Sequence, residues 1–430
     1  MDRTPTAHQR GIGRNSGQFA LLAVQVFFVG LMIGMERAVL PTLSGQFGVK
    51  PDAFFFLASF VLSFGLVKGA LNFVAGAWSD RIGRKPVLLI GWLAGVPIPL
   101  LIYFAPNWWW IIAANVFLGI NQGFTWTMTV TSQIDLAGSH QRGLAVGINE
   151  ATGYVTVGIA GLGAAYLAGV FGPRPALLGF GLVTIVLGLI VLVRLRDTLP
   201  WVRAESAQAQ SRKPVGTTEP ATPGWGAIFM LVSFRDRQCR ALCQGGVANK
   251  IADTLVWVLL PIFFRQQGLK LAEIGWITGL YAMVWGLSQL WTGHLADRIG
   301  RKTPIVAGFL LLAAGIALTA LGTARIVWFV AAAIMGVGMA LLYPNLIAAM
   351  SDLTPPLWRG KALGTYRYWR DTGYAIGAVL LGLTAQVSDA VRPAMWLTAA
   401  LVAGSGLWIA FSIEKPQVTE KRVTAERGQI

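Results

Sequence analysis

Long apolar stretches separated by short polar turns run through the whole chain. Each approaches the roughly 20 residues that a helix needs to cross the hydrocarbon core of a bilayer. The stretches lack the strict alternation of a barrel strand, and inside lipid only helices and closed barrels satisfy the backbone hydrogen bonds. The pattern therefore predicts an all-α integral membrane protein with twelve transmembrane helices, at residues 18–41, 54–77, 87–105, 108–131, 143–169, 175–193, 241–264, 273–295, 304–323, 327–350, 361–386 and 393–413.

One long polar segment divides this pattern into two halves of similar length. Within it, residues 206–223 are rich in Ala, Gln, Thr and Pro, which is typical of a flexible linker. The predicted organisation is an N-terminal tail (1–17), a six-helix bundle (18–193), a linker (194–240), a second six-helix bundle (241–413) and a C-terminal tail (414–430).

Charge is scarce in this chain and unevenly placed. Charged residues make up 13% of the 430 residues, against about 25% in a soluble protein. The net charge of +16 could indicate nucleic-acid binding, but 24 of the 35 Lys and Arg fall on the side that holds the termini and the linker, and 6 on the other. By the positive-inside rule this places both termini in the cytoplasm, with the chain in the cytoplasmic (inner) membrane, and it leaves no role for nucleic acid.

A ten-residue motif occurs twice. Residues 76–85 (Gly-Ala-Trp-Ser-Asp-Arg-Ile-Gly-Arg-Lys) recur as 293–302 (Gly-His-Leu-Ala-Asp-Arg-Ile-Gly-Arg-Lys), an offset of 217. Asp135 and Arg142 recur as Asp352 and Arg359 at the same offset. The two halves are therefore parallel repeats, related by an axis along the membrane normal. The charged parts of the motif, 80–85 and 297–302, are called the charged boxes below.

The box between the second and third spans resembles the signature loop of the major facilitator superfamily, and its recurrence extends the resemblance over essentially the whole chain. The resemblance implies two pseudo-symmetric six-helix bundles that rock around a central site, giving alternating access. We expect the acidic box residues to bond helix ends across the seam between the halves in one state and to release them in the other, as a cytoplasmic gate. The alternative is that the basic residues only hold the loops inside. The candidate gate residues are Gly76, Asp80, Arg81, Gly83, Arg84, Asp135, Arg142, Gly293, Asp297, Arg298, Gly300, Arg301, Asp352 and Arg359.

Ionisable residues inside the spans are costly in lipid and are functional candidates by default. They are Glu36, Arg37, Lys68, Glu150, Lys250, Asp253, Arg367, Arg370 and Asp371. None falls in the third, sixth, ninth or twelfth span, which in the family are lipid-facing supports. The sequence therefore predicts that these groups line the substrate or proton pathway. Aligning the first and seventh spans through Pro41 and Pro261 places Asp253 opposite Ile33.

The four intramembrane carboxylates are candidates for proton coupling. Asp253 and Asp371 lie close along their helices to Lys250 and Arg367, so fixed ion pairs are an equal alternative for these two. Glu150 has no basic residue within four positions and is the first choice as proton carrier. Its alternative role is an interhelical pair with Lys68 or an arginine.

Several uncharged polar residues complete the predicted site: Asn121, Gln122, Asn149, Tyr343 and Asn345. Interhelical hydrogen bonds, worth about 0.6 kcal/mol each, are the alternative role for every one of them. The two cysteines and three histidines show no metal-ligand spacing, and the spans hold no Ser-His or Cys-His constellation. We therefore expect no metal site, no cofactor and no enzymatic activity.

The leading hypothesis is a secondary active transporter of a small polar or anionic metabolite, coupled to the proton motive force. Five intramembrane cations against four acids favour an anion, with Lys68, Arg367 and Arg370 as its ligands. The alternative is proton-driven efflux of drugs or organic cations, bound by Glu36, Glu150 and Asp253. A non-transporting membrane sensor or assembly factor is a third, different class. The expected partners are a small-molecule substrate and the lipid bilayer, and the expected state is a monomer.

Overall fold

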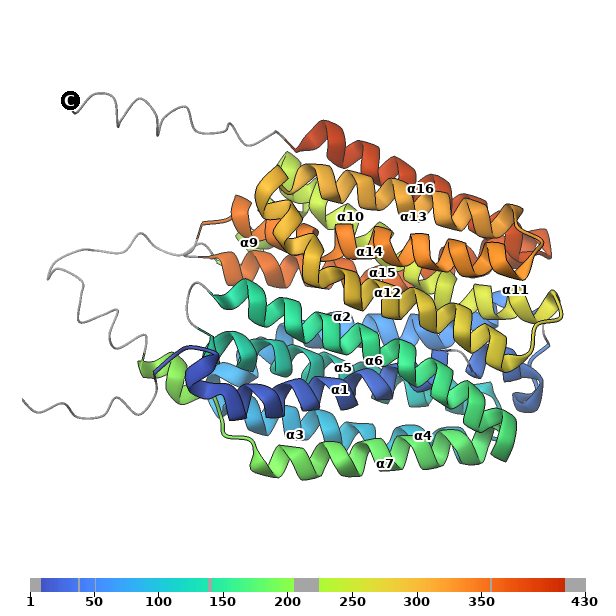
Figure 1. The fold of residues 1–430 in the computed structure, drawn as a ribbon, viewed down its shortest axis with the longest axis horizontal. Coiled ribbons are helices and arrows are strands. Elements are labelled where there is room, and N and C mark those ends of the chain that lie inside the picture. The colour runs from blue at the N-terminus through green and yellow to red at the C-terminus, as the bar shows by residue number, and fades with distance from the viewer. Residues whose placement is uncertain are drawn as a thin grey trace, which may run out of the picture.

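The computed structural model describes residues 9–37, 39–50, 52–137, 141–204, 224–355 and 358–413, and these contain helices and no strand (Figure 1). The first half comprises α1 (Ser16–Arg37), the 3-10 helix η2 (Leu40–Phe47), α2 (Phe54–Ile82), α3 (Arg84–Gly95), α4 (Pro97–Phe104), α5 (Trp108–Leu136), α6 (Arg142–Phe171) and α7 (Pro173–Arg194). The second half comprises α10 (Arg237–Thr254), the π-helical turn η5 (Leu255–Leu259), α11 (Leu260–Gln266), α12 (Leu271–Ile299), α13 (Lys302–Leu321), α14 (Arg325–Leu353), α15 (Arg359–Ser388) and α16 (Val391–Ser412).

These helices form the twelve predicted spans, with α3 and α4 making the third and α10, η5 and α11 the seventh. Among the described residues, nine spans are long and apolar enough to cross a membrane by length and composition alone. The other three, α5, α12 and α15, are less apolar because they bury polar side chains at the centre of the molecule, including Gln122, Gln289 and Asp371.

The sequence repeat extends to the helix ends. Adding 217 to the bounds of α2 gives those of α12, and the same shift converts α5 into α14 and α6 into α15. The last residue of α1, Arg37, maps onto Thr254, the last residue of α10. The duplication therefore relates individual positions of the two halves throughout the membrane region.

The two halves meet along two seams, α2 against α15 and α6 against α12 (Figure 1). Both charged boxes lie at one end of the molecule, called the box end below. In the central part of the seams the helices touch closely. A Cβ on Gly65 of α2 would lie 2.6 Å from the Cβ of Tyr374, and one on Gly286 of α12 would lie 2.6 Å from the backbone nitrogen of Val155. Only glycine allows such close approach of two helices.

The same helix faces are not in contact near the box end. Gly76 follows Gly65 by about three helical turns and Gly293 follows Gly286 by about two, so each continues the face of its predecessor. A Cβ at Gly76 or Gly293 would meet no described atom within 4 Å. The two halves are therefore joined at the centre and separate toward the box end.

The predicted linker 194–240 contains helical structure, which the composition did not indicate. Helix α9 (Trp225–Met230) continues into the π-helical segment η4 (Leu231–Arg235), and α10 starts at Arg237. Ile228 and Val232 are buried, which gives this segment a protein-facing side. Residues 206–223, which carry the linker prediction, lie outside the described residues, as do 1–8 and 414–430.

Candidate functional site

Asp253, near the end of α10, accepts three hydrogen bonds. Lys250, one turn earlier, donates from Nζ to Oδ2 at 2.6 Å. The hydroxyl of Tyr281 on α12 donates to Oδ1 at 2.6 Å, and that of Tyr374 on α15 donates to Oδ2 at 3.1 Å. All four side chains are buried. A buried ion pair is stable only when such additional donors satisfy the carboxylate, so this geometry favours the fixed pair of the two roles that the sequence left open.

The ammonium group of Lys250 is surrounded by aromatic rings. Its Nζ lies 4.9 Å from the ring centres of Trp285 and Tyr343, 5.2 Å from that of Tyr374 and 5.7 Å from that of Tyr154. Tyr154 belongs to α6 in the first half, yet its ring stacks on Trp285 of α12 at 3.5 Å between centres. Cation–π contacts of this kind stabilise a desolvated cation, and here they also join the two halves.

A second buried pair lies on α15. Arg370 donates to Asp371 from Nε at 2.7 Å and from Nη2 at 2.9 Å, and its Nη1 donates to the hydroxyl of Tyr343 at 3.0 Å. Asn72 of α2 donates to the same carboxylate at 2.5 Å across the seam. The sequence spacing predicted Arg367 as the partner of Asp371, but the partner in the structure is the adjacent residue, Arg370.

Glu36, at the end of α1, has few partners. Its Oε2 accepts one hydrogen bond from Asn115 of α5 at 2.9 Å, and its Oε1 is buried without one. The neighbouring Arg37 places its Cζ 3.0 Å from the ring centre of Trp257, and its buried Nη1 also has no hydrogen-bond partner. Both side chains line a cavity of about 10 Å³ with Phe64, which is room for about one water molecule.

Glu36 and Asp253 occupy equivalent positions in the two halves. Gly30 packs on Thr156 as Val247 packs on Gly373, and both pairs are related by 217 residues, so α1 and α10 are in register at that offset. The alignment through Pro41 and Pro261 is therefore wrong by three residues. It fails because the chain leaves α1 through a 3-10 helix and α10 through a π-helical turn, which displaces the prolines.

The register also identifies the counterparts of the three donors to Asp253. In place of Lys250, Tyr281 and Tyr374 the first half has Ile33, Phe64 and Val157. All three are buried and apolar. These three positions are thus polar in the second half, around Asp253, and apolar in the first half.

Lys68 and Glu150 are buried ionisable residues, and neither forms an ion pair with another described residue. Lys68 of α2 forms no hydrogen bond with a described residue, and its Nζ lies 5.4 Å from the ring centre of Phe64 and 5.6 Å from that of Trp126. Glu150 of α6 accepts from the indole of Trp126 at 2.9 Å, and its Oε2 is buried without a partner. Arg367, equivalent to Glu150 by the repeat, is half-buried on α15.

The uncharged polar residues that the sequence assigned to the site do not all lie at the centre of the molecule. Asn121 donates to the carbonyl of Gly91 on α3, and Gln122 donates to that of Val29 on α1, so both link helices. The Oε1 of Gln122 and the Oδ1 of Asn149 are buried without partners. Asn345 accepts from Arg301 at 3.4 Å and belongs to the second box instead of the centre.

The first charged box forms a network within its own half, in which Arg84 and Asp135 are buried and Asp80 is exposed. Arg84 donates to Asp135 of α5 at 2.8 Å and to Asp80 at 3.0 Å, and Thr198 also donates to Asp135. Gly83 has a φ of 100°, which turns the chain between α2 and α3. Asp80 therefore pairs with the next turn of its own box, and no bond from it to α15 is formed. The halves are separated there, so among the described residues this conformation is the one in which the gate bond of Asp80 is broken, and the bonded state stays a prediction.

The second box repeats this pairing loosely. Arg301 and Asp352 are the counterparts of Arg84 and Asp135, yet their atoms are 3.4 Å apart. Their side chains are 28% and 63% exposed, against 6% and 9% in the first box. Arg359 donates to the carbonyl of Thr354. The other gate residues lie at the box end. Arg81 and Arg298 are exposed, and Arg142 is the first residue of α6. Gly76 and Gly293 lie within the last two turns of α2 and α12, and Gly300 caps the end of α12. The side chain of Asp297 is outside what the structure describes.

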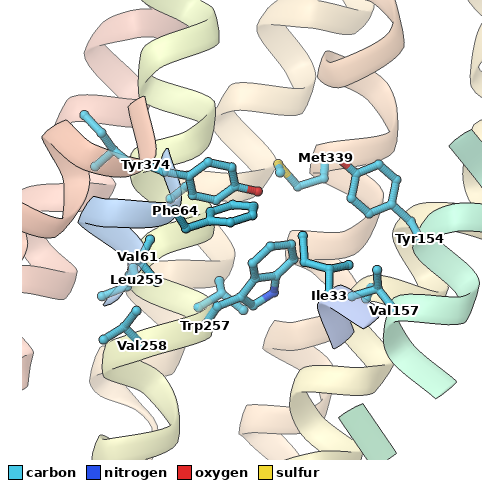
Figure 2. Packing of buried hydrophobic residues seen from close by; sticks show 14 of the residues in the cluster. Ile33, Val61, Phe64, Tyr154, Val157, Leu255, Trp257, Val258, Met339 and Tyr374 are labelled. Atoms are coloured by element: carbon cyan, nitrogen blue, oxygen red, sulfur yellow. The ribbon is translucent and has the colours of Figure 1, made fainter. Parts of the chain in front are cut away.

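An apolar layer that includes Phe64 packs beside the charged residues Arg37 and Lys68 (Figure 2). Figure 2 shows residues of both halves gathered here, Ile33, Val61, Phe64 and Val157 from the first, and Leu255, Trp257 and Val258 from the second. All are buried. The two halves are therefore packed together at this level, while the seams toward the box end are parted.

Four side chains of the centre were missed from sequence: Tyr154, Tyr281, Asn115 and Thr127, which donates to Asn72 at 3.1 Å. One of them carried a readable signal. Tyr154 follows Glu150 by four residues, so it shares a helix face with a residue already singled out.

Comparison with known proteins agrees with this architecture. The profile of the family described as Major Facilitator Superfamily matches residues 22–241 and again 242–429. The gallate transporter of Pseudomonas putida is 26% identical over 390 residues, 84% of this chain and 86% of that protein. The multidrug resistance protein MdtH of Yersinia enterocolitica is 33% identical over 133 residues, 29% of this chain and 32% of that protein. A solved structure of a bacterial homologue of the human lysosomal transporter Spinster, inward-facing and unoccupied, has a TM-score of 0.70 at 12% identity, covering 94% of this chain and 99% of its own.

Proposed function

The chain belongs to the major facilitator superfamily and is a multi-pass membrane transporter of a small solute, and we propose that it carries a small organic anion together with a proton. An aromatic carboxylate is the substrate class that the site fits best. Alternating access follows from the family architecture, in which two halves rock about a central site. The chain is not an enzyme, since this is a family of transporters.

The observation that carries the proposal is the buried ammonium of Lys68. Two of the five central cations, Lys250 and Arg370, are matched by Asp253 and Asp371. Lys68 is buried and has no carboxylate within bonding distance among the described residues. A buried charge without a partner is strongly unfavourable, so a bound anion is the natural counter-ion for Lys68. Arg367 on α15, in the opposing half, is the second proposed ligand.

The aromatic side chains near Lys68 and Lys250 support a ring-containing substrate. Trp126, Tyr154, Trp285 and Tyr343 form a continuous set of rings with centre-to-centre distances of 3.5 to 5.5 Å. Rings of this kind bind flat apolar faces by stacking or edge contacts. Gallate, which names the relative that covers 84% of this chain, is itself an aromatic carboxylate.

Glu36 is the proposed proton carrier. Its single donor, its partnerless Oε1 and its apolar neighbours make an ionised carboxylate costly and a protonated one tolerable. Glu150 remains the second candidate, because its Oε2 is also without a partner. A proton on Glu36 compensates the charge of the anion, so the loaded carrier has no added net charge to move.

The direction of access follows from the distribution of basic residues. With the box end in the cytoplasm, the parted seams make this a conformation open to the cytoplasm. We place the protein in the inner membrane with both termini cytoplasmic, acting as a monomer and driven by the proton motive force alone. The open side exposes the route to Lys68, and the apolar layer closes the route to the other face.

Uptake into liposomes tests the proposal. Purified protein is reconstituted, and labelled gallate is added with an acidic exterior. We expect accumulation above equilibrium that a protonophore abolishes. Lys68→Met should lose saturable uptake while Lys68→Arg, which keeps the charge, retains it. Accumulation that survives collapse of the pH gradient would refute the coupling, and normal uptake by Lys68→Met would refute the anion site.

Efflux of organic cations is the second candidate function. It is favoured by the similarity of 29% of the chain to MdtH and by the unpaired carboxylates Glu36 and Glu150. In that case the carboxylates would bind the cation and Lys68 would be dispensable. Export of a fluorescent cation by cells that express Lys68→Met, at the wild-type rate, would therefore favour efflux over anion transport.

A further inference from the structure

The segment Trp225–Arg235, which precedes α10, has an exposed apolar face that neither the fold nor the proposed function explains. Ile228 and Val232 point into the protein. Met230, Leu231 and Phe234 are 44%, 37% and 47% exposed, and their spacing places them on one side of the helix. Large apolar side chains concentrated on one exposed helix face are characteristic of an element that lies in the interface of a bilayer.

Basic residues border this face where the segment joins α10. Arg235, Arg237 and Arg240 are all exposed. Arg237 donates to the carbonyl of Phe411 and Arg240 to that of Phe234, which leaves most of their donors available, and Arg235 forms no bond with a described residue. Asp236, the one acid here, is occupied as the N-cap of α10. The patch is therefore cationic beside an apolar face.

The position of the patch selects its partner. Arg237 is the first residue of the transmembrane helix α10, and Phe411 lies in the last turn of α16. Arg235, Arg237 and Arg240 thus stand at the level where two spans enter the membrane. At that depth the surrounding anions are lipid phosphates, and the negative surface potential of such lipids attracts basic side chains.

The segment also holds α15, the helix that carries Arg370 and Asp371. The indole of Trp369 donates to the hydroxyl of Ser233 at 2.8 Å. Phe229 stacks on Trp369 at 6.2 Å between ring centres, and Phe234 meets the same ring edge-on at 6.1 Å. Anything that fixes the segment therefore also fixes this part of α15.

We propose that residues 225–240 form a binding site for one anionic phospholipid of the box-end leaflet, and that the bound lipid stabilises α15 through the contacts of Ser233 and Trp369. The acyl chains cover Met230, Leu231 and Phe234, and the guanidinium groups of Arg235 and Arg240 bind the phosphate. The site is independent of which solute is carried.

Native mass spectrometry of the purified full chain, titrated with phosphatidylglycerol or phosphatidylcholine, tests the site. We expect preference for phosphatidylglycerol, reduced roughly tenfold in Arg235→Gln/Arg240→Gln and kept in Arg235→Lys/Arg240→Lys. Arg203→Gln, an exposed arginine at the same end, is the matched control and should bind like wild type. Glycerol phosphate should not compete. Equal binding of both lipids by wild type, an unchanged Gln/Gln variant, or competition by glycerol phosphate would overturn the proposal.

The link to α15 has its own test. Phosphatidylglycerol should raise the melting temperature of wild type, and Trp369→Phe, which loses the bond to Ser233, should bind the lipid normally but show a smaller increase. An equal increase in Trp369→Phe would refute the coupling and leave the binding site intact.

Discussion

Glu36 and Asp253 occupy the same position in the two halves and have opposite surroundings. Asp253 accepts from Lys250, Tyr281 and Tyr374. Glu36 accepts from Asn115 alone, and the counterparts of the three donors are apolar. A duplicated scaffold has thus kept a carboxylate in both halves while its neighbours diverged. The second half holds a fixed charge, and the first holds a carboxylate for which binding a proton removes an electrostatic cost.

Neutralising Glu36 and neutralising Asp253 should therefore have opposite effects on the stability of the protein. Removing one partner of a buried ion pair leaves the other charge uncompensated and destabilises strongly. Neutralising a buried carboxylate that has no ion pair removes a desolvation cost instead. Stability measurements on equivalent substitutions therefore separate the two roles before any transport is measured.

Asp253→Asn should have the largest effect. It removes the charge that holds Lys250 and should lower the free energy of unfolding by about 3–5 kcal/mol, since the lysine is left buried and unpaired. Thermal unfolding in detergent measures this. Glu36→Gln is the matched control at the equivalent position, and its melting temperature should be unchanged or higher. A similar loss in both variants would show that the two carboxylates have the same structural role.

The double variant Lys250→Met/Asp253→Leu checks the cause of that loss. Apolar residues of similar size remove both charges together, and such replacements are often neutral or stabilising. We expect it to recover most of the stability lost in Asp253→Asn. If the double variant is as unstable as the single one, the pair is not the source of the loss.

Tyr281→Phe should have an intermediate effect. It converts one donor of Asp253 into the residue found at the equivalent position beside Glu36, Phe64, and leaves Oδ1 without its hydrogen bond. Loss of a hydrogen bond to a charged group costs about 1.5–3 kcal/mol. The same unfolding experiment measures it, with Tyr166→Phe, an exposed tyrosine on α6, as control. An effect no larger than that of the control would mean that Tyr281 does not support the pair.

Phe64→Tyr, the reverse change in the first half, should have the smallest effect. Phe64 lines the cavity beside Glu36, so a hydroxyl there supplies the donor that Glu36 lacks. A hydrogen bond to the ionised carboxylate favours that form, and a bond of about 1–1.5 kcal/mol corresponds to about one pH unit. We expect the pH midpoint of uptake to fall by that amount. An unchanged midpoint would argue that Glu36 does not titrate during transport.

The sequence was sufficient for the fold and for the location of the charges. Apolar length gave the twelve spans, and the recurrence of 76–85 at 293–302 gave the parallel halves. Eight of the nine ionisable residues of the spans are buried, and their place in a pathway stays a prediction. These features are predictable because the cost of polar groups in lipid restricts where each can lie.

The spacing on α10 allowed the Lys250–Asp253 pair, but the pairing on α15 could not be predicted. The four-residue spacing suggested Arg367 as the partner of Asp371. The side chain of Arg370 is long enough to reach this adjacent carboxylate. Arg370 also donates to the hydroxyl of Tyr343, and Asn72 donates to Asp371. Pro41 and Pro261 misalign α1 and α10 by three residues because they lie beyond the ends of these helices, in η2 and α11. Whether Asp80 bonds across the seam depends on whether the seam is open or closed, which one sequence does not encode.

The most direct test of the account compares Glu36→Gln with Glu150→Gln in liposomes, under two regimes. One is exchange of labelled for unlabelled substrate without a pH gradient, and the other is accumulation driven by the gradient. The account predicts that Glu36→Gln still exchanges substrate but no longer accumulates it, while Glu150→Gln does both. Gradient-driven accumulation by Glu36→Gln at the wild-type level would contradict it.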